Sequence, residues 1–121
     1  MNIESVKTLF ELFSGEEASE KYIPLITLSV IEVERMLLPD VDRLDMRLDF
    51  LCAAFANHKL QEINAARERS EYTSAGKMLT VSQNTALKYA KNLLHDYMNL
   101  CAELIKEKTF VFMGFSDITE E

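Results

Sequence analysis

The stretch Phe50-Leu-Cys-Ala-Ala-Phe-Ala56 decides the fold, because it is apolar on almost every side of a helix. A helix of this kind is surrounded by other helices or covered by a neighbouring subunit. We therefore predict a long central helix from about Arg43 to Arg69. Its main stripe, at helical spacing, comprises Leu44, Leu48, Leu51, Cys52, Phe55 and Ile63.

Two shorter helices are predicted before the central one. The first covers Ile3–Phe13 and ends at Ser14-Gly15. The start of the second is open: Ser14 or Ser19 could cap it, and Ile23-Pro24 could lie in its first turn, where proline is favoured. The second helix closes at Leu38-Pro39-Asp40, because proline disfavours helical geometry in the residue before it.

A last helix is predicted from about Asn84 to Lys108, with Asn84 or Ser82 as its cap. The link that precedes it, residues 70–84, reads Ser-Glu-Tyr-Thr-Ser-Ala-Gly-Lys-Met-Leu-Thr-Val-Ser-Gln-Asn and is polar and β-leaning. Helices in compact bundles are usually joined by roughly 2–8 residues, so a longer link indicates a further role.

Residues 72–81 of this link could form a hairpin-like excursion or one extended strand. The exposed edge of such a strand could pair with a neighbouring subunit; the alternative is a loop that lies on its own bundle. The candidate interaction residues of this arm are Tyr72, Met78, Leu79 and Val81.

The C-terminal end concentrates aromatic residues in Phe110-Val-Phe-Met-Gly-Phe115, just before an acidic tail. Side chains of this size are buried somewhere, either by folding back over their own core or by insertion into a partner. Phe110, Phe112, Met113 and Phe115 are the candidate interaction residues of this second arm.

These elements predict an all-α fold in one domain over residues 1–121, a small bundle of about four helices. Residues 1–109 form the helical body, with the 70–84 arm as a long, partly extended insertion between the last two helices. Residues 110–121 form a short apolar extended arm and an acidic tail.

The chain is acidic, with a formal net charge of −7, and the charge is distributed unevenly. Residues 1–45 carry a net −6, residues 46–109 a net +2 and the tail a net −3. A duplex-binding protein normally presents a basic face, so tight DNA binding is not expected. An acidic surface could complement a basic protein partner, or repel DNA from the wall of a channel.

No apolar stretch approaches the ~20 residues that span a bilayer, and the N-terminus lacks the features of a signal peptide, so we expect no membrane contact and a cytoplasmic location. Cys52 and Cys101 lie in apolar helical patterns and are expected to be buried thiols in a reducing compartment.

Residues suited to catalysis are scarce, since the chain has only two histidines. His58 and Glu62 are four apart on one helix face and could supply two metal ligands, yet no second pair is evident, and a solvated pair is the plainer interpretation. Arg67, Arg69 and Lys77 flank Tyr72; they could form a nucleic-acid surface or a salt-bridged helix end. We predict no catalytic residue, no metal, no cofactor and no small-molecule substrate.

The order of features resembles the small head-tail connector, or adaptor, proteins of tailed bacteriophages and prophages. The resemblance covers most of the length and is carried by Phe13-Ser-Gly-Glu-Glu17, Tyr22-Ile-Pro-Leu-Ile26, Asp45-Met-Arg-Leu-Asp-Phe-Leu-Cys-Ala-Ala-Phe-Ala-Asn57, Ala65-Ala-Arg-Glu68, the segment 72–82 and the long last helix. The chain departs from the pattern in its phenylalanine-rich end and in the scarcity of small residues in its last helix.

The resemblance implies a non-enzymatic structural subunit that forms a ring beneath the portal and joins head to tail around the DNA channel. Its partners would be copies of itself and portal or tail-completion proteins, and DNA would only pass through. It would reside in the bacterial host cytoplasm, and in the virion of a functional phage. The alternative is a bacterial helical-bundle module that binds a protein partner and has no phage role.

Overall fold

The computed structural model describes the backbone of residues 1–75 and 81–106 and the side chains of residues 1–68 and 85–106. Within these residues the chain forms four α-helices, one short 3₁₀ helix and no strand, which confirms the all-α prediction. The elements are α1 (Ile3–Ser14), η1 (Glu20–Tyr22), α2 (Ile23–Met36), α3 (Met46–Ala75) and α4 (Val81–Leu100).

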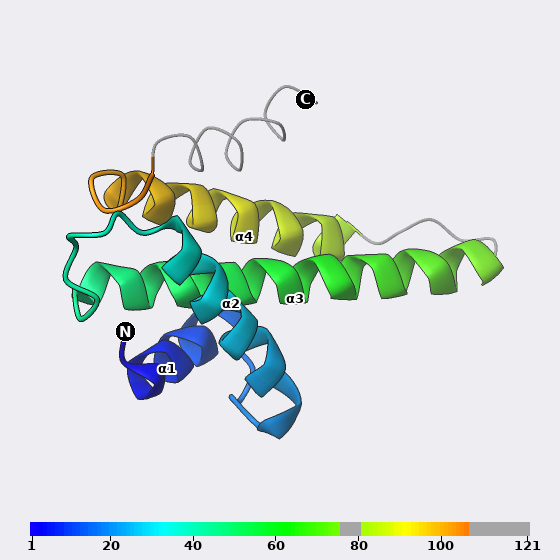
Figure 1. Ribbon diagram of the computed structural model, residues 1–121. Coiled ribbons are helices and arrows are strands. Elements are labelled where there is room, and N and C mark those ends of the chain that lie inside the picture. The colour runs from blue at the N-terminus through cyan, green and yellow to red at the C-terminus, as the bar shows by residue number, and fades with distance from the viewer. Residues whose placement is uncertain (76–80, 107–121) are drawn as a thin grey trace.

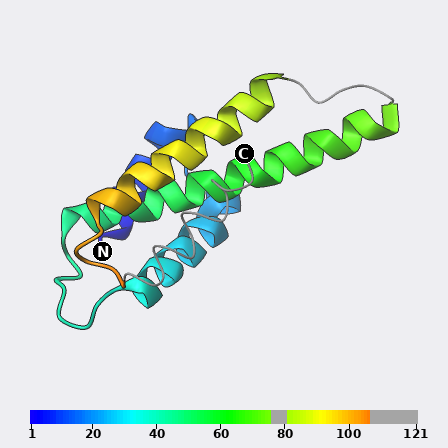
Figure 2. The same ribbon diagram turned by 90° about the horizontal axis from the view of Figure 1, so that it is seen from above.

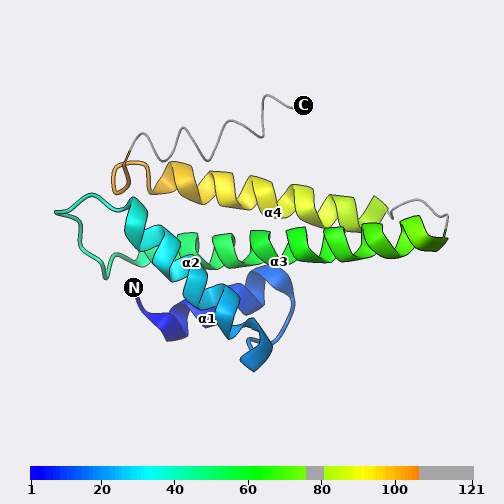
Figure 3. The ribbon, with the colours of Figure 1, turned by 45° about the vertical axis from the view of Figure 1, so that its right-hand side comes forward.

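The longest helix, α3, organises the other three (Figure 1). Helix α4 returns antiparallel along α3, while α1 and α2 pack on the N-terminal half of α3. The views from above and from the side agree that the far ends of α3 and α4 extend past α1 and α2 (Figures 2 and 3). The described chain is therefore a four-helix body from which a two-helix hairpin projects.

The predicted central stretch is the centre of the core. Leu51, Cys52, Ala53, Ala54 and Ala56 are fully buried, and Phe55 is nearly so. Burial on opposite sides of one helix requires cover from several directions, which α1, α2 and α4 supply. The side chains packed with this stretch include Val6, Phe10, Ile26, Val33, Met98 and Ile105.

Helix α1 has well-defined ends that follow from its sequence. The Asn2 side chain accepts hydrogen bonds from the backbone N–H groups of Glu4 and Ser5, at 3.0 and 3.2 Å, and so caps the helix. At the other end Gly15 adopts φ 76°, the left-handed conformation that glycine takes without a steric penalty, and donates its N–H to the Glu11 carbonyl. The predicted end at Ser14-Gly15 is confirmed.

Helix α2 begins at Ile23 with Pro24 in its first turn, one of the starts that the sequence allowed. It ends at Met36, and Leu37 is extended and forms an antiparallel bridge with Ile105. Proline at position 39 agrees with a helix that has already stopped.

The boundaries of α3 differ from the prediction at both ends. The helix begins at Met46, and the preceding Asp45 accepts a hydrogen bond from the Arg47 N–H at 3.0 Å. Leu44, which was expected on the core stripe, therefore precedes the helix and is 76% exposed. Ile63, also expected on that stripe, is 42% exposed, because it lines an open cleft between the start of α2 and α3.

The predicted 70–84 arm falls on a part of the chain that the structure describes only in part. α3 continues to Ala75 and α4 starts at Val81, so residues 70–75 and 81–84 are helical where an extended segment was expected. Helix continuation satisfies each backbone group within the chain, which an isolated extended strand does not. Residues 76–80 lie outside the described residues, and the extended conformation stays a prediction there.

The last helix ends at Leu100, well before the predicted Lys108. The chain then turns through hydrogen bonds such as Leu104 N–H to the Cys101 carbonyl, at 2.8 Å. The Leu38 N–H donates to the Leu104 carbonyl at 3.0 Å, and the Lys106 N–H donates to the Met36 carbonyl at 2.8 Å. Pairing with the end of α2 satisfies groups that a longer α4 would leave unsatisfied there. Residues 107–121, including the predicted C-terminal arm, lie outside the described residues.

Candidate interaction surfaces

The projecting hairpin is the first candidate surface. Among its described side chains, residues 61–68 of α3 and 85–92 of α4, only Ala65 and Ala90 are buried. By contrast, all of residues 51–57 in the body are buried. The hairpin is therefore held by one narrow seam between two helices, and Tyr89 on its α4 side is 67% exposed.

A two-helix hairpin leaves most of its perimeter without a partner inside its own chain. Helices in proteins gain most of their stability from tertiary packing of an apolar face, so such a hairpin gains stability when another molecule covers it. The exposed apolar residues near this part of the chain, Ile63 and Tyr89, are suited to that contact.

The predicted interaction residues are distributed unevenly over the described chain. Tyr72 lies three residues before the end of α3, and Val81 is the first residue of α4, so both are at the tip of the hairpin. Met78 and Leu79 fall within residues 76–80, outside the described part. The second predicted set, Phe110, Phe112, Met113 and Phe115, comes after the last described residue, Lys106.

The second candidate surface is a cleft between the start of α2 and the middle of α3. Its volume is ≈ 290 Å³, and it is lined by Lys21, Tyr22, Leu25, Leu60, Ile63, Asn64 and Arg67. Aliphatic side chains form much of the lining, and two basic residues come from different elements. A cavity of this size is just below the range of small-molecule pockets, ~300–1,000 Å³, and suits one or two partner side chains.

The Tyr22 ring, which lines the cleft, is held from three directions. The Phe10 ring lies 5.4 Å from it, the Lys21 ammonium lies 5.1 Å above its centroid, and its hydroxyl donates to Glu16 Oε1 at 3.2 Å. Sequence reasoning missed this cleft and placed Arg67 beside Tyr72 instead. No local pattern connects Lys21 with Arg67, because only the packing of η1 and the start of α2 near α3 brings them together.

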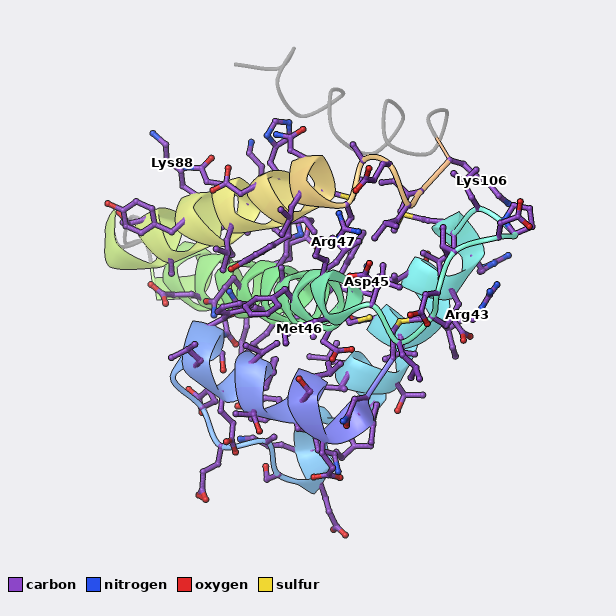
Figure 4. The ribbon with its side chains drawn as sticks, turned by 90° about the vertical axis from the view of Figure 1, so that its left-hand side faces the viewer. Arg43, Asp45, Met46, Arg47, Lys88 and Lys106 are labelled. Carbon is purple, nitrogen blue, oxygen red and sulfur yellow. The ribbon has the colours of Figure 1, made fainter. Side chains whose placement is uncertain are left out.

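A group of charged side chains joins the start of α3 to the turn that follows α4. Arg47 donates to Asp45 Oδ2 at 2.7 Å and to Glu103 Oε1 at 2.6 Å, linking the start of α3 to the turn after α4 (Figure 4). The hydrogen bond from the Arg47 side chain is the main reason why the pKa of Asp45 falls to about 2. The same partners raise the pKa of Arg47. These ion pairs therefore hold the start of α3 against the turn after α4.

The residues with metal-binding or nucleophilic chemistry are dispersed. His58 Nδ1 and Glu62 Oε1 are 3.7 Å apart, the i, i+4 pair expected from the sequence. Among the side chains that the structure describes, no three or more from His, Cys, Asp or Glu are grouped so that they could hold a metal ion. Both cysteines are free and buried, and burial raises the pKa of Cys52 to about 12 and of Cys101 to about 11.

None of the helices in the described part of the chain is both long and apolar enough to span a membrane. Comparison of the chain with known protein families, with characterised proteins and with solved structures finds no match.

Proposed function

We propose that this chain is a non-enzymatic assembly subunit, a head-tail connector of a tailed phage or prophage that forms a ring beneath a portal. The observation that carries the proposal is the projecting α3–α4 hairpin, which is covered by α1 and α2 over only part of its length. A subunit that completes its packing against neighbours leaves such an element uncovered in the single chain.

The charge of the chain is compatible with this role. A net charge of −7 disfavours tight binding to nucleic acid, since phosphate neutralisation needs a basic face. A ring around a DNA channel lets DNA slide when acidic side chains line its wall. In the proposed role DNA is cargo that passes through, and the binding partners are proteins: further copies of this chain, the portal and tail-completion proteins.

Mixing the full chain with the portal protein encoded in the same gene cluster tests the proposal. Mass photometry and negative-stain electron microscopy are expected to show a portal whose mass rises by a whole number of chains, with a new ring on one face. A portal of unchanged mass in the presence of excess chain would contradict it. The free chain is not required to form rings, because a connector subunit can remain monomeric until it binds the portal.

The second candidate function is a protein-interaction module without a phage role, and the cleft between α2 and α3 favours it. A cleft that combines the aliphatic residues Leu25, Leu60 and Ile63 with the basic residues Lys21 and Arg67 is suited to a peptide. Such a module would remain a monomer or dimer with every portal protein tested, and its gene would not lie among portal, capsid and tail genes.

A further inference from the structure

The cleft between the start of α2 and α3 contains apolar surface that the described chain leaves uncovered. Leu60 on α3 is buried, at 5% exposure, whereas Ile63, three residues later on the same helix, is 42% exposed. Leu25 on α2 is half-buried. An apolar side chain from another molecule would gain stability by covering Ile63 and Leu25.

The charged residues that line this cleft are both basic. Lys21 belongs to η1 and Arg67 to α3, and both side chains are exposed. Neither forms an ion pair with another side chain that the structure describes. The chain as a whole carries a net charge of −7, so these two bases are a local exception. A carboxylate at the cleft would receive charge-assisted hydrogen bonds from either basic side chain.

The size and charge of the cleft limit what can occupy it. Small-molecule pockets usually measure ~300–1,000 Å³ and enclose most of the ligand. This cleft measures ≈ 290 Å³, and the exposure of Lys21, Ile63 and Arg67 leaves it open to solvent. It therefore suits side chains that belong to a larger partner. Nucleic acid is disfavoured as that partner, because it carries many charges that an acidic chain repels.

We propose that the α2–α3 cleft binds a protein segment in which an acidic residue lies next to an aliphatic or aromatic residue. The apolar side chain lies against Leu25, Leu60 and Ile63, and the carboxylate binds Lys21 or Arg67. Exposed ion pairs are individually weak, so the apolar contact supplies much of the affinity and the charges supply the selectivity. This inference rests on the second candidate function, since it names the class of peptide that the cleft takes, and it does not depend on the connector role.

Selection from a phage-displayed library of random linear peptides on the full chain tests the proposal. The enriched sequences are expected to combine acidic with aliphatic or aromatic residues. Titration of the most enriched peptide, followed by fluorescence anisotropy, is expected to show binding about fivefold weaker or more with Arg67→Glu and nearly unchanged with Arg67→Lys. The matched control Lys88→Glu reverses an exposed charge on α4, on another side of α3 from α2, and is expected to leave the affinity unchanged (Figure 4).

Methyl NMR of the same titration locates the peptide. The Ile63 resonances are expected to shift, whereas those of Ile3, which is also 42% exposed but lies at the start of α1, are expected to stay in place. Circular dichroism melting shows whether each variant is folded. If Arg67→Glu melts at a lower temperature than wild type, Lys21→Glu repeats the test from the other element.

Four results would contradict the proposal. Enriched peptides without acidic residues that still shift Ile63 would exclude the acidic class but keep the peptide-binding module. Shifts confined to other methyl groups, or no enriched peptide at all, would show that the cleft is not a peptide site. Ile63 resonances that move when the chain alone is concentrated would identify a second copy as the occupant. Equal losses of affinity with Arg67→Glu and Lys88→Glu would show that net charge, and not the cleft, controls binding.

Discussion

Leu37 and Ile105 pair across an antiparallel bridge that joins the end of α2 to the segment after α4. Both side chains are buried, at 4% and 2% exposure. Residues 101–106 therefore belong to the folded body although they are not helical.

Removing the buried side chain on one side of this bridge tests its importance. Ile105→Ala is expected to lower the free energy of unfolding by about 2–5 kcal/mol, because it leaves a cavity beside α2. Leu100→Ala, at a side chain that is 49% exposed, is the control and is expected to cost about 1 kcal/mol or less. Urea denaturation followed by circular dichroism measures both. Equal, small losses of unfolding free energy in the two variants would show that residues 101–106 do not belong to the core.

The central helix supplies a second prediction. Leu51 is fully buried in the middle of α3, and truncation to alanine is expected to destabilise the chain by about 2–5 kcal/mol. Leu44→Ala, at a position 76% exposed before α3, is expected to change stability by about 0.5 kcal/mol or less. Thermal melting of the two variants distinguishes them; similar melting temperatures would contradict the core described above.

The Asp45–Arg47 pair predicts a pH dependence with a defined sign. The pKa of Asp45 is about 2 in the folded chain against an ordinary 3.8, so the folded state favours the carboxylate. Its contribution to stability is fully present above about pH 4 and is lost as the pH falls toward 2. Asp45→Asn is expected to be less stable than wild type at neutral pH and to lose less stability over that interval. Denaturation series at several pH values measure the effect, and parallel pH profiles for the two proteins would contradict it.

The buried thiols predict low reactivity. With the pKa of Cys52 near 12 and of Cys101 near 11, little thiolate is present at pH 8, and neither sulfur is exposed. A thiol reagent such as DTNB is expected to react on the order of 100-fold more slowly with the folded chain than with the chain unfolded in urea. Two cysteines that react at once in the folded chain would show that the body is open around them.

The core was predictable because its signal is local. The apolar run Phe50–Ala56 must be covered on all sides in any fold that the chain adopts. Gly15 marks the end of α1 and Pro24 the start of α2 through their own backbone preferences. The Asn2 cap was missed although asparagine is a preferred capping residue, because it lies too close to the chain start to stand out as a pattern.

The end of α4 was not predictable from its own residues. Leu104 and Ile105 continue the apolar stripe of α4, and neither glycine nor proline interrupts it. The helix stops because the chain instead pairs with Met36 and Leu38, which are distant in the sequence. The α2–α3 cleft was missed for a similar reason, since Lys21 and Arg67 share only a tertiary relationship.

The most direct measurement of the central claim, that the projecting hairpin is an assembly surface, compares two exposed apolar residues. Tyr89→Glu alters the hairpin and Leu12→Glu alters α1, at 67% and 72% exposure, so neither is expected to shift the melting temperature by more than a few degrees. Mass photometry of each variant mixed with the portal protein is expected to show the added ring mass with Leu12→Glu and its loss with Tyr89→Glu. Full ring mass with Tyr89→Glu, or equal loss with both, would contradict the assignment of the hairpin as the assembly surface.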